Sequence, residues 1–132
     1  MATHDIVQAS YDRCLANGDF FQTFYDIFLA TSPDIASKFA QTDFNKQKNI
    51  IKASVAMMIR LGTGNANARR IIEKVGDTHG QQGLDIRPAF YDLWLNSLCN
   101  AIEIHDTEYS AELATLWRER MQEGIQLVID RY

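Results

Sequence analysis

The sequence predicts an all-helical fold. Its 132 residues include only 2 prolines and 7 glycines, which is too few for the many turns of a β-sandwich or a β-barrel. Between these breakers the apolar residues recur every three or four positions, the spacing of a helix with one buried face, and no stretch shows the alternation of a β-strand. We therefore expect six or seven helices in a single domain that spans residues 1–132.

The first two expected helices are separated by a stop signal. The first helix runs from about Thr3 to Asn17-Gly18, where the glycine ends it. The second starts at Asp19, and one of its faces is a wide, mostly aromatic stripe. The residues of this face are Phe20, Phe24, Ile27, Phe28 and Thr31.

A short third helix and a longer fourth helix follow. Ser32-Pro33-Asp34 opens the third, because serine is a favoured N-cap, proline fits the first helical position and an acidic first turn suits the helix dipole. This helix ends near Phe39. Thr42 or Asp43 caps the fourth helix, which keeps an apolar face up to the Gly- and Asn-rich loop at residues 62–67.

Three more expected helices complete the chain. A modest fifth helix is ended by Gly80 and Gly83. Pro88 is tolerated in the first turn of the sixth helix. After the turn His105-Asp106-Thr107, the last helix covers residues 108 to about 131. Its inward residues are predicted to be Leu113, Trp117, Met121, Gly124 and Val128.

Charge and hydropathy exclude several classes of partner. The net charge of −4 argues against binding to nucleic acid or to an anionic membrane surface. No apolar run approaches the roughly 18 residues that a membrane span needs, and residues 1–18 lack the features of a secretory signal, so the cytoplasm is the expected location. Cys14 and Cys99 have no metal-site spacing, and we expect both to be small buried residues.

The residues show no constellation typical of an enzyme, and no catalytic residue is predicted. No Ser-His-Asp arrangement has local support, and no cluster has the spacing of a zinc or di-iron site. His4 lies near the N-terminus and His105 at a helix end, and both are expected to be solvated. His79 lies one turn after Val75 on an apolar face, where a histidine is either a structural residue or a metal ligand, and the spacing alone favours the structural role.

The order of several motifs points to a known family. Unequal helix lengths argue against an up-down bundle, and the lack of an internal repeat argues against a solenoid. The motifs are Phe24-Tyr25-x-x-Phe28, Ser32-Pro33-Asp34, Phe39, Val75, Thr78-His79-Gly80-Gln81-Gln82-Gly83, Phe90-Tyr91 and Trp117. In this order and at these intervals, over nearly the whole chain, the sequence resembles bacterial single-domain haemoglobins and the globin domain of flavohaemoglobins.

The resemblance implies a globin fold that holds one haem b, iron protoporphyrin IX. His79 corresponds to the proximal histidine that ligates the haem iron, and Val75 is expected to line the pocket beside it. Phe39 corresponds to the phenylalanine that packs on the porphyrin, and Tyr25, fourteen residues earlier, to the distal tyrosine. The link after Phe39 is shorter than in close family members, so the fourth short helix of the family is expected to be missing.

The other ligand-side residues are expected on the helix that follows this link. Ile51 is matched to the apolar residue over the iron, which makes Gln47 the distal gate and places Phe44 one turn earlier. A slip of one residue would offer Lys46 or Lys48 in place of Gln47. No histidine lies in this helix, so ligation of the iron by two histidines is not expected.

On the proximal side, Tyr91 corresponds to a tyrosine that in flavohaemoglobin-like globins joins a glutamate to polarise the proximal histidine. The position of that glutamate falls at Tyr132 in this chain, and the nearest carboxylate is that of Asp130. The chain therefore departs from the family pattern at this point. Arg87 and Lys74 are the residues expected near the haem propionates.

The resemblance implies a protein that reversibly binds dioxygen, and also NO or CO, at a haem. An alternative is an NO dioxygenase or another haem redox enzyme that works with an external reductase, since these 132 residues hold no reductase domain. A second alternative is a haem-based gas sensor, or a globin-shaped interaction module without haem.

Overall fold

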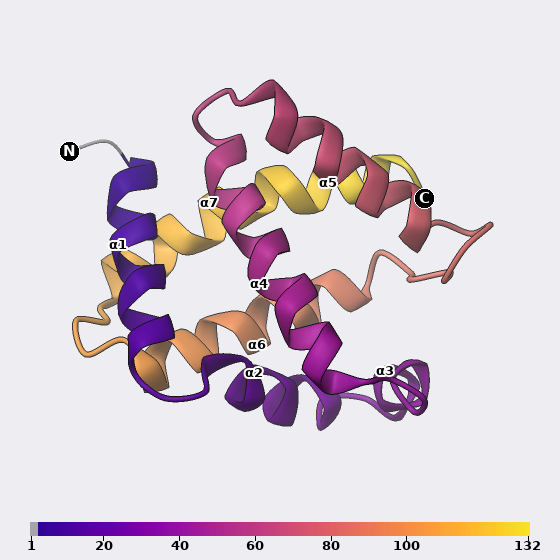
Figure 1. The fold of residues 1–132 in the computed structure, drawn as a ribbon, viewed down its shortest axis with the longest axis horizontal. Helices are drawn as coiled ribbons and strands as arrows, with labels where there is room; N and C mark the ends of the chain where they lie inside the picture. Colours follow the sequence, from indigo (N-terminus) through magenta and orange to yellow (C-terminus); the bar gives the residue numbers. More distant parts are fainter. Residues whose placement is uncertain (1–2) are drawn as a thin grey trace.

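The computed structural model describes the backbone of residues 3–132 and the side chains from Ile6 onward, and over this range the chain is all-helical, as predicted. The helices are α1 (Thr3–Ala16), α2 (Phe20–Leu29), α3 (Pro33–Lys38), α4 (Phe44–Leu61), α5 (Ala66–His79), α6 (Phe90–His105) and α7 (Ala111–Asp130), shown in Figure 1. Residues 39–43, between α3 and α4, form a turn and a short link, so this described segment contains no short helix, as the sequence predicted.

Local capping signals set the starts of α2, α3 and α4. The carboxylate of Asp19, the hydroxyl of Ser32 and the carboxylate of Asp43 each accept a hydrogen bond from a backbone N–H two or three residues later. Of the two caps expected for the fourth helix, the structure therefore selects Asp43. Such bonds satisfy N–H groups that have no partner inside the helix, and for this reason the sequence predicts these boundaries well.

Two helix starts differ from the prediction. Pro88 lies in a turn just before α6 and not in its first helical turn. Helix α7 begins at Ala111 with Ser110 as its N-cap, three residues later than expected. The cause is the carboxylate of Asp106, which accepts a hydrogen bond of 2.9 Å from the backbone N–H of Glu108 and so holds this segment in a turn.

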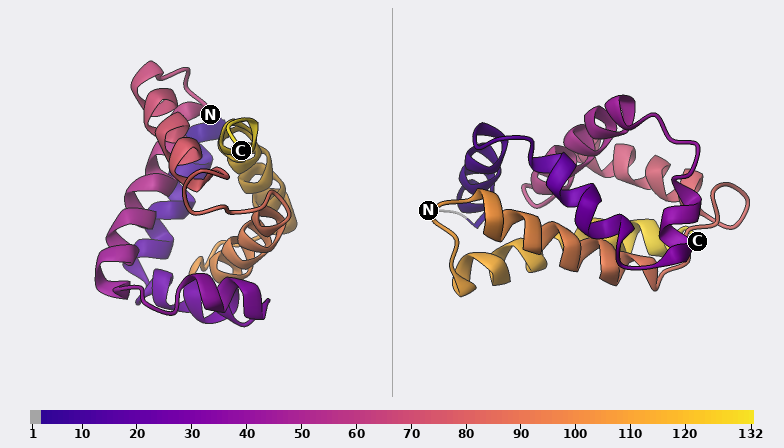
Figure 2. Two further views of the ribbon diagram at one scale, coloured as in Figure 1. Left: turned by 90° about the vertical axis from the view of Figure 1, so that its right-hand side faces the viewer. Right: turned by 90° about the horizontal axis from the view of Figure 1, so that it is seen from below.

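The helices cross and pair around one interior. Helix α2 packs along α6, α5 packs along α7, and α4 contacts α1, α5 and α7. Figure 1 shows α4 crossing the centre of the molecule, with α5 above it and with α2 and α3 below it. In the view from below in Figure 2, α6 and α7 run side by side. This arrangement brings residues from six of the seven described helices around one space near the end of α5.

Aromatic side chains dominate the core. Trp117 on α7 is fully buried, and its ring meets the ring of Tyr11 edge-on at 6.1 Å. On α2, Phe24 stacks on Phe28 at 5.3 Å and meets Trp94 of α6 edge-on at 6.1 Å. The inward face predicted for the last helix is confirmed, because its members are all buried: Leu113, Trp117, Met121, Gly124 and Val128.

The structure bears on two predictions made from composition. Cys14 and Cys99 are both buried and both free, as expected for small core residues. Within residues 3–132, none of the helices combines the length and the apolar character needed to cross a bilayer.

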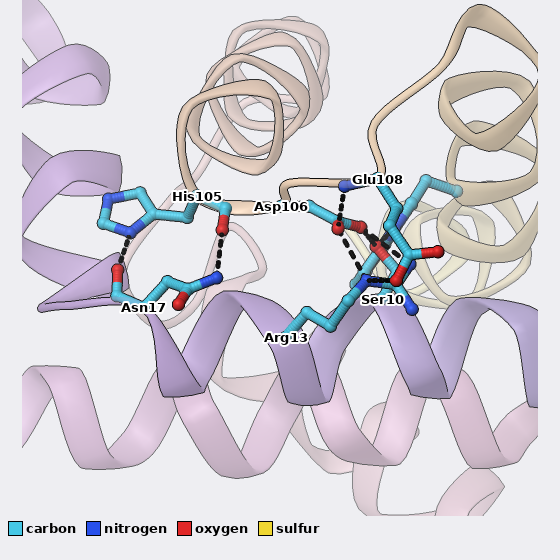
Figure 3. A network of polar contacts seen from close by, with 7 residues as sticks. Ser10, Arg13, Asn17, His105, Asp106 and Glu108 are labelled. Atoms are coloured by element: carbon cyan, nitrogen blue, oxygen red, sulfur yellow. Dashed lines mark hydrogen bonds and ion pairs between the residues drawn. The ribbon is translucent and has the colours of Figure 1, made fainter.

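A buried polar group ties α1 to the turn between α6 and α7 (Figure 3). Asp106 is 3% exposed; it accepts a hydrogen bond from the hydroxyl of Ser10 and two from Arg13, from Nε at 2.6 Å and from Nη2 at 3.0 Å. The hydroxyl of Ser10 accepts one from the indole N–H of Trp117 at 2.9 Å. Burial alone would raise the pKa of Asp106, but the hydrogen bonds from Arg13, Ser10 and a backbone N–H outweigh it and lower this pKa. We call these four residues the Asp106 cluster.

His105, which we expected to be solvated, is half-buried, and both nitrogens of its ring have partners within the protein. Its Nδ1 donates a hydrogen bond to the carbonyl of Asn17, its Nε2 lies 2.7 Å from the hydroxyl of Thr23, and its ring meets that of Phe20 edge-on. Figure 3 shows Asn17 contacting both the ring and the carbonyl of His105. These partners lie 82 and 88 residues away in the sequence, so no local pattern reveals them. The side chain of His4 lies outside the described residues.

Candidate functional site

A pocket of about 1000 Å³, which includes its open mouth, lies among helices α2 to α7. Its wall is mostly aliphatic and aromatic. The polar side chains on the described wall are few: Tyr25, Lys38, Gln47, Ser54, His79 and Tyr91. A concave apolar surface with a small number of polar groups is typical of a site for a small molecule or a cofactor.

This pocket brings together seven of the nine residues predicted to bind a cofactor. They are Tyr25, Phe39, Gln47, Ile51, Val75, His79 and Tyr91. Phe44 does not line the pocket but packs directly behind its wall, with its ring 5.3 Å from that of Tyr25 and 6.0 Å from that of Phe39. Arg87 also lies outside the lining, and its guanidinium forms an ion pair of 3.3 Å with Asp34.

The structure also places the alternatives to Gln47. Lys48 points toward α2, where its ammonium lies 3.0 Å from the carboxylate of Asp19 and 2.7 Å from the amide oxygen of Gln22. Lys46 is exposed, and neither lysine is among the described residues that line the pocket. Gln47, between them, does line it.

His79 is the last residue of α5, and its imidazole is held by its own helix. Nδ1 lies 2.7 Å from the carbonyl of Val75, one turn earlier. Because a carbonyl can only accept, Nδ1 carries the proton and Nε2 keeps its lone pair. Burial lowers the pKa of His79 and outweighs the opposite effect of this hydrogen bond, so the ring is neutral near pH 7. The acceptor is thus a carbonyl within the helix.

The loop after α5 folds back on the end of this helix. The N–H of Leu84 donates to the carbonyl of Thr78 at 2.9 Å, and the N–H of Ile86 donates to the carbonyl of His79 at 2.8 Å. A Cβ at Gly83 would lie only 2.2 Å from the carbonyl oxygen of Thr78, so only glycine fits here without a shift of the backbone. The glycine therefore allows the loop to close on the helix that carries the histidine.

Tyr25 and Gln47 give another part of the pocket its polar character. Tyr25 is 2% exposed, and burial raises the pKa of its hydroxyl to about 12. The side chain of Gln47 acts on this pKa in the opposite direction, which reflects its position close to the hydroxyl. The tyrosine thus keeps its proton at neutral pH and remains a hydrogen-bond donor.

Tyr91 has a buried hydroxyl that makes no hydrogen bond within the described part of the chain. Burial raises its pKa to about 12. The acidic partner expected from the family pattern is missing in this region: the hydroxyl of Tyr132 donates to Asp85 at 2.6 Å, and the carboxylate of Asp130 accepts from Gln126 at 2.7 Å. A buried hydroxyl without a partner is unfavourable, so the position of Tyr91 favours a ligand that would supply one.

Sequence reasoning missed much of the apolar wall. Four residues line the pocket although none was predicted as a site residue: Met58, Ile72 and Ile125 lie on helices, and Ile86 lies in a loop. Lys38 was also missed, although it precedes Phe39 directly. The one available signal was the helical phase, because Met58 lies about two turns after Ile51 on the same face.

Comparison with known proteins identifies the family. No protein-family model matches the chain, and no curated protein sequence matches it significantly. A solved structure does match: a protein from Pseudomonas aeruginosa PAO1, described as structurally highly homologous to a human haemoglobin, is 38% identical to this chain. The two align with a TM-score of 0.95 over 99% of this chain and 98% of that chain. The chain belongs to the globin family.

The family implies a haem, and the pocket of this globin fits one. His79 offers a neutral Nε2, and on the described wall it is accompanied by no other histidine and by no cysteine, aspartate or glutamate. A metal held there must bring its other ligands with it, as a porphyrin iron does. The apolar wall suits the porphyrin faces, and the buried hydroxyl of Tyr91 lacks a partner within the described residues.

Proposed function

We propose that this globin binds one haem b and there reversibly binds dioxygen, with NO and CO as further ligands, in the manner of bacterial single-domain haemoglobins. One observation carries the proposal. A neutral histidine, His79, lines a mostly apolar pocket whose wall also holds Tyr25 and Gln47. When bound, the haem would supply an iron with a coordination position for a diatomic ligand.

The imidazole of His79 is oriented and protonated as an iron ligand requires. Its Nδ1 is committed to the carbonyl of Val75, which fixes both the tautomer and the orientation of the ring and leaves Nε2 as the ligating atom. Because burial keeps the imidazole neutral, no proton has to be removed from Nε2 before it binds a metal. Phe39, Ile51 and other apolar residues would pack against the porphyrin and exclude water.

Tyr25 and Gln47 would act on the diatomic ligand. A buried hydroxyl that keeps its proton can donate to dioxygen, which carries partial negative charge when bound. Such a bond stabilises the ligand by about 1–3 kcal/mol, or roughly ten- to a hundredfold in retention. Since CO carries less charge, this pair of donors favours dioxygen.

The proximal side supports reversible binding over peroxidase-like chemistry. A carboxylate acting on the proximal histidine would make the imidazole a stronger electron donor to the iron. Here Nδ1 of His79 instead donates to the neutral carbonyl of Val75, and Tyr91 has no acidic partner within the described residues. An NO dioxygenase that uses an external reductase is the alternative that the experiment below must separate.

Titration of the apoprotein with hemin, followed by the Soret absorbance, tests the proposal. We expect one hemin per chain, and we expect His79→Ala to weaken binding about tenfold or more because it removes the iron ligand. His105→Ala is the matched control, since the ring of His105 is bound to Asn17 and Thr23. This variant should take up hemin like the wild type.

Two outcomes would contradict the proposal. A wild-type protein that stays colourless in excess hemin would show that the pocket holds no haem. An unchanged spectrum and affinity in His79→Ala would remove this histidine from the site. When the oxygenated protein meets NO in the presence of a reductant, stoichiometric consumption supports a binding protein, whereas sustained turnover would assign the redox alternative.

A further inference from the structure

Lys38 is the one lysine on the described wall of the pocket, which contains no arginine, aspartate or glutamate. It is the last residue of α3 and is exposed, so it lies where the pocket opens to solvent. Its ammonium donates to the carbonyls of Leu84, at 2.9 Å, and Asp85, at 3.2 Å. Both carbonyls belong to the loop at residues 80–89, and Figure 1 shows α3 and this loop at the same end of the molecule.

The contacts of Lys38 leave its charge uncompensated. An ammonium carries three N–H donors, and the carbonyls of Leu84 and Asp85 occupy two of them. Within the described residues, no carboxylate lies within ion-pair distance of Nζ. The nearby carboxylate of Asp85 is already bound to the hydroxyl of Tyr132. One donor and a full positive charge therefore remain available at the mouth of the pocket.

The other cations considered for this site are placed differently. Arg87 pairs with Asp34 and its guanidinium lies 4.9 Å from the centre of the Phe90 ring. Lys48 pairs with Asp19 on α2. The exposed side chain of Lys74 is not part of the described wall. Lys38 is thus the cation best placed to meet a negative group on a molecule inside the pocket.

We propose that Lys38 binds a carboxylate of the cofactor and couples it to the loop that follows His79. The inference rests on the proposed function, because a haem carries two propionate carboxylates on one edge. A carboxylate at the mouth takes the free N–H of Lys38, and the ammonium then bridges it to Leu84 and Asp85. The same loop is bound to the end of α5, because the N–H of Ile86 donates to the carbonyl of His79. A carboxylate bound to Lys38 therefore stabilises the loop that holds the end of the helix carrying this histidine.

The size of the effect follows from exposure. An ion pair in contact with water is screened, so its loss changes the rate of cofactor release by about two- to fivefold. Salt weakens such a pair, and the difference should shrink as the ionic strength rises. A second consequence concerns the loop, where the amide protons of residues 84–86 should exchange faster without the lysine.

The experiment measures transfer of hemin from the full-length holoprotein to an excess of apomyoglobin. It compares the wild type with Lys38→Gln, with the conservative variant Lys38→Arg and with the control Lys52→Gln, each loaded with hemin or with hemin dimethyl ester. Lys52 is exposed and is not among the described residues that line the pocket. We expect Lys38→Gln to speed hemin release about two- to fivefold, Lys38→Arg to restore most of the wild-type rate, and Lys52→Gln to have no effect. For the ester, which lacks the carboxylates, all four proteins should release at similar rates.

Several results would overturn the inference. Equal hemin release from the wild type and Lys38→Gln would remove Lys38 from the site. Equal acceleration for hemin and for its ester would mean that the lysine acts through the loop alone. Uptake of hemin by the wild type without any effect of Lys38→Gln refutes this inference and leaves the proposed function standing, whereas a wild type that takes up no hemin refutes both.

Discussion

At the scale of single residues, unsatisfied polar atoms mark the site. Nε2 of His79, the hydroxyl of Tyr91 and the side chain of Lys38 all lie on the wall of one pocket. The hydroxyl of Tyr91 is buried and makes no hydrogen bond within the described residues, and Nε2 of His79 keeps its lone pair because Nδ1 is bound to the carbonyl of Val75. Folding pairs most buried polar groups, so an unpaired hydroxyl and a histidine lone pair on one apolar wall point to a ligand. Lys38 differs from these two because it is exposed, and it adds a positive charge where the pocket meets solvent.

Tyr25→Phe tests the role of the distal hydroxyl. Removing a donor to bound dioxygen should speed its dissociation about tenfold or more, and should change CO dissociation less, because CO accepts hydrogen bonds weakly. Stopped-flow measurement of both off-rates checks this. Tyr11→Phe is the matched control, since Tyr11 donates to the carbonyl of Lys52 and is not among the pocket residues. Equal dioxygen off-rates in the wild type and Tyr25→Phe would exclude a hydrogen bond from this hydroxyl to the ligand.

The sequence could identify residues that belong to local motifs, but it could not identify residues whose position depends on distant contacts. Tyr25, Phe39 and His79 could be matched because each belongs to a short motif with fixed spacing. The partners of His105 and the wall position of Ile86 could not be predicted, because both depend on contacts between segments far apart in the chain. Lys38 could have been noted from its place beside Phe39, but only the structure shows its bonds to the loop.

At the scale of elements, α5 and the loop after it act as one unit. Gly83→Ala should disturb this unit, because a Cβ would lie 2.2 Å from the carbonyl oxygen of Thr78 and the backbone would have to move. We expect a loss of about 1–3 kcal/mol in the free energy of unfolding, measured with urea, together with faster hemin release. Gln82→Ala, at an exposed position of the same loop, is the control and should change neither quantity. A fully stable Gly83→Ala variant with unchanged release would show that the loop adapts without cost.

Some helix starts are set by neighbouring residues in the sequence, and others depend on contacts with distant segments. The starts of α2, α3 and α4 lie close to where the sequence predicts them, and the structure shows Asp19, Ser32 and Asp43 as their N-caps, which act on their own backbone within three residues. The start of α7 did not follow from local signals. The carboxylate of Asp106 holds the N–H of Glu108 in a turn, and Asp106 is itself fixed by side chains of α1 that lie more than ninety residues away.

At the scale of the whole molecule, the Asp106 cluster joins the two ends of the chain. Arg13 and Ser10 of α1 bind the carboxylate of Asp106, and Trp117 of α7 binds Ser10, so residues from both ends meet at one buried group. The cluster does not line the pocket. Its loss should therefore lower the stability of the fold and leave the ligand-binding properties of the folded fraction unchanged.

Asp106→Asn tests this prediction through the pH dependence of the free energy of unfolding. The native pKa of Asp106 is lowered, so the carboxylate binds fewer protons in the folded chain than in the unfolded chain, and it stabilises the fold at every pH above the unfolded-state value. This contribution is lost as pH falls through the native pKa. Near neutral pH we expect the variant to lose about 2–4 kcal/mol of unfolding free energy, because Arg13 is left beside a neutral amide. Urea unfolding at decreasing pH should show the two curves approach each other once the pH falls below the unfolded-state pKa of Asp106 and toward its lowered native pKa, because the wild-type carboxylate then begins to take up its proton. A difference that stays constant over this range would mean that the cluster acts through shape and packing, and not through the charge of Asp106.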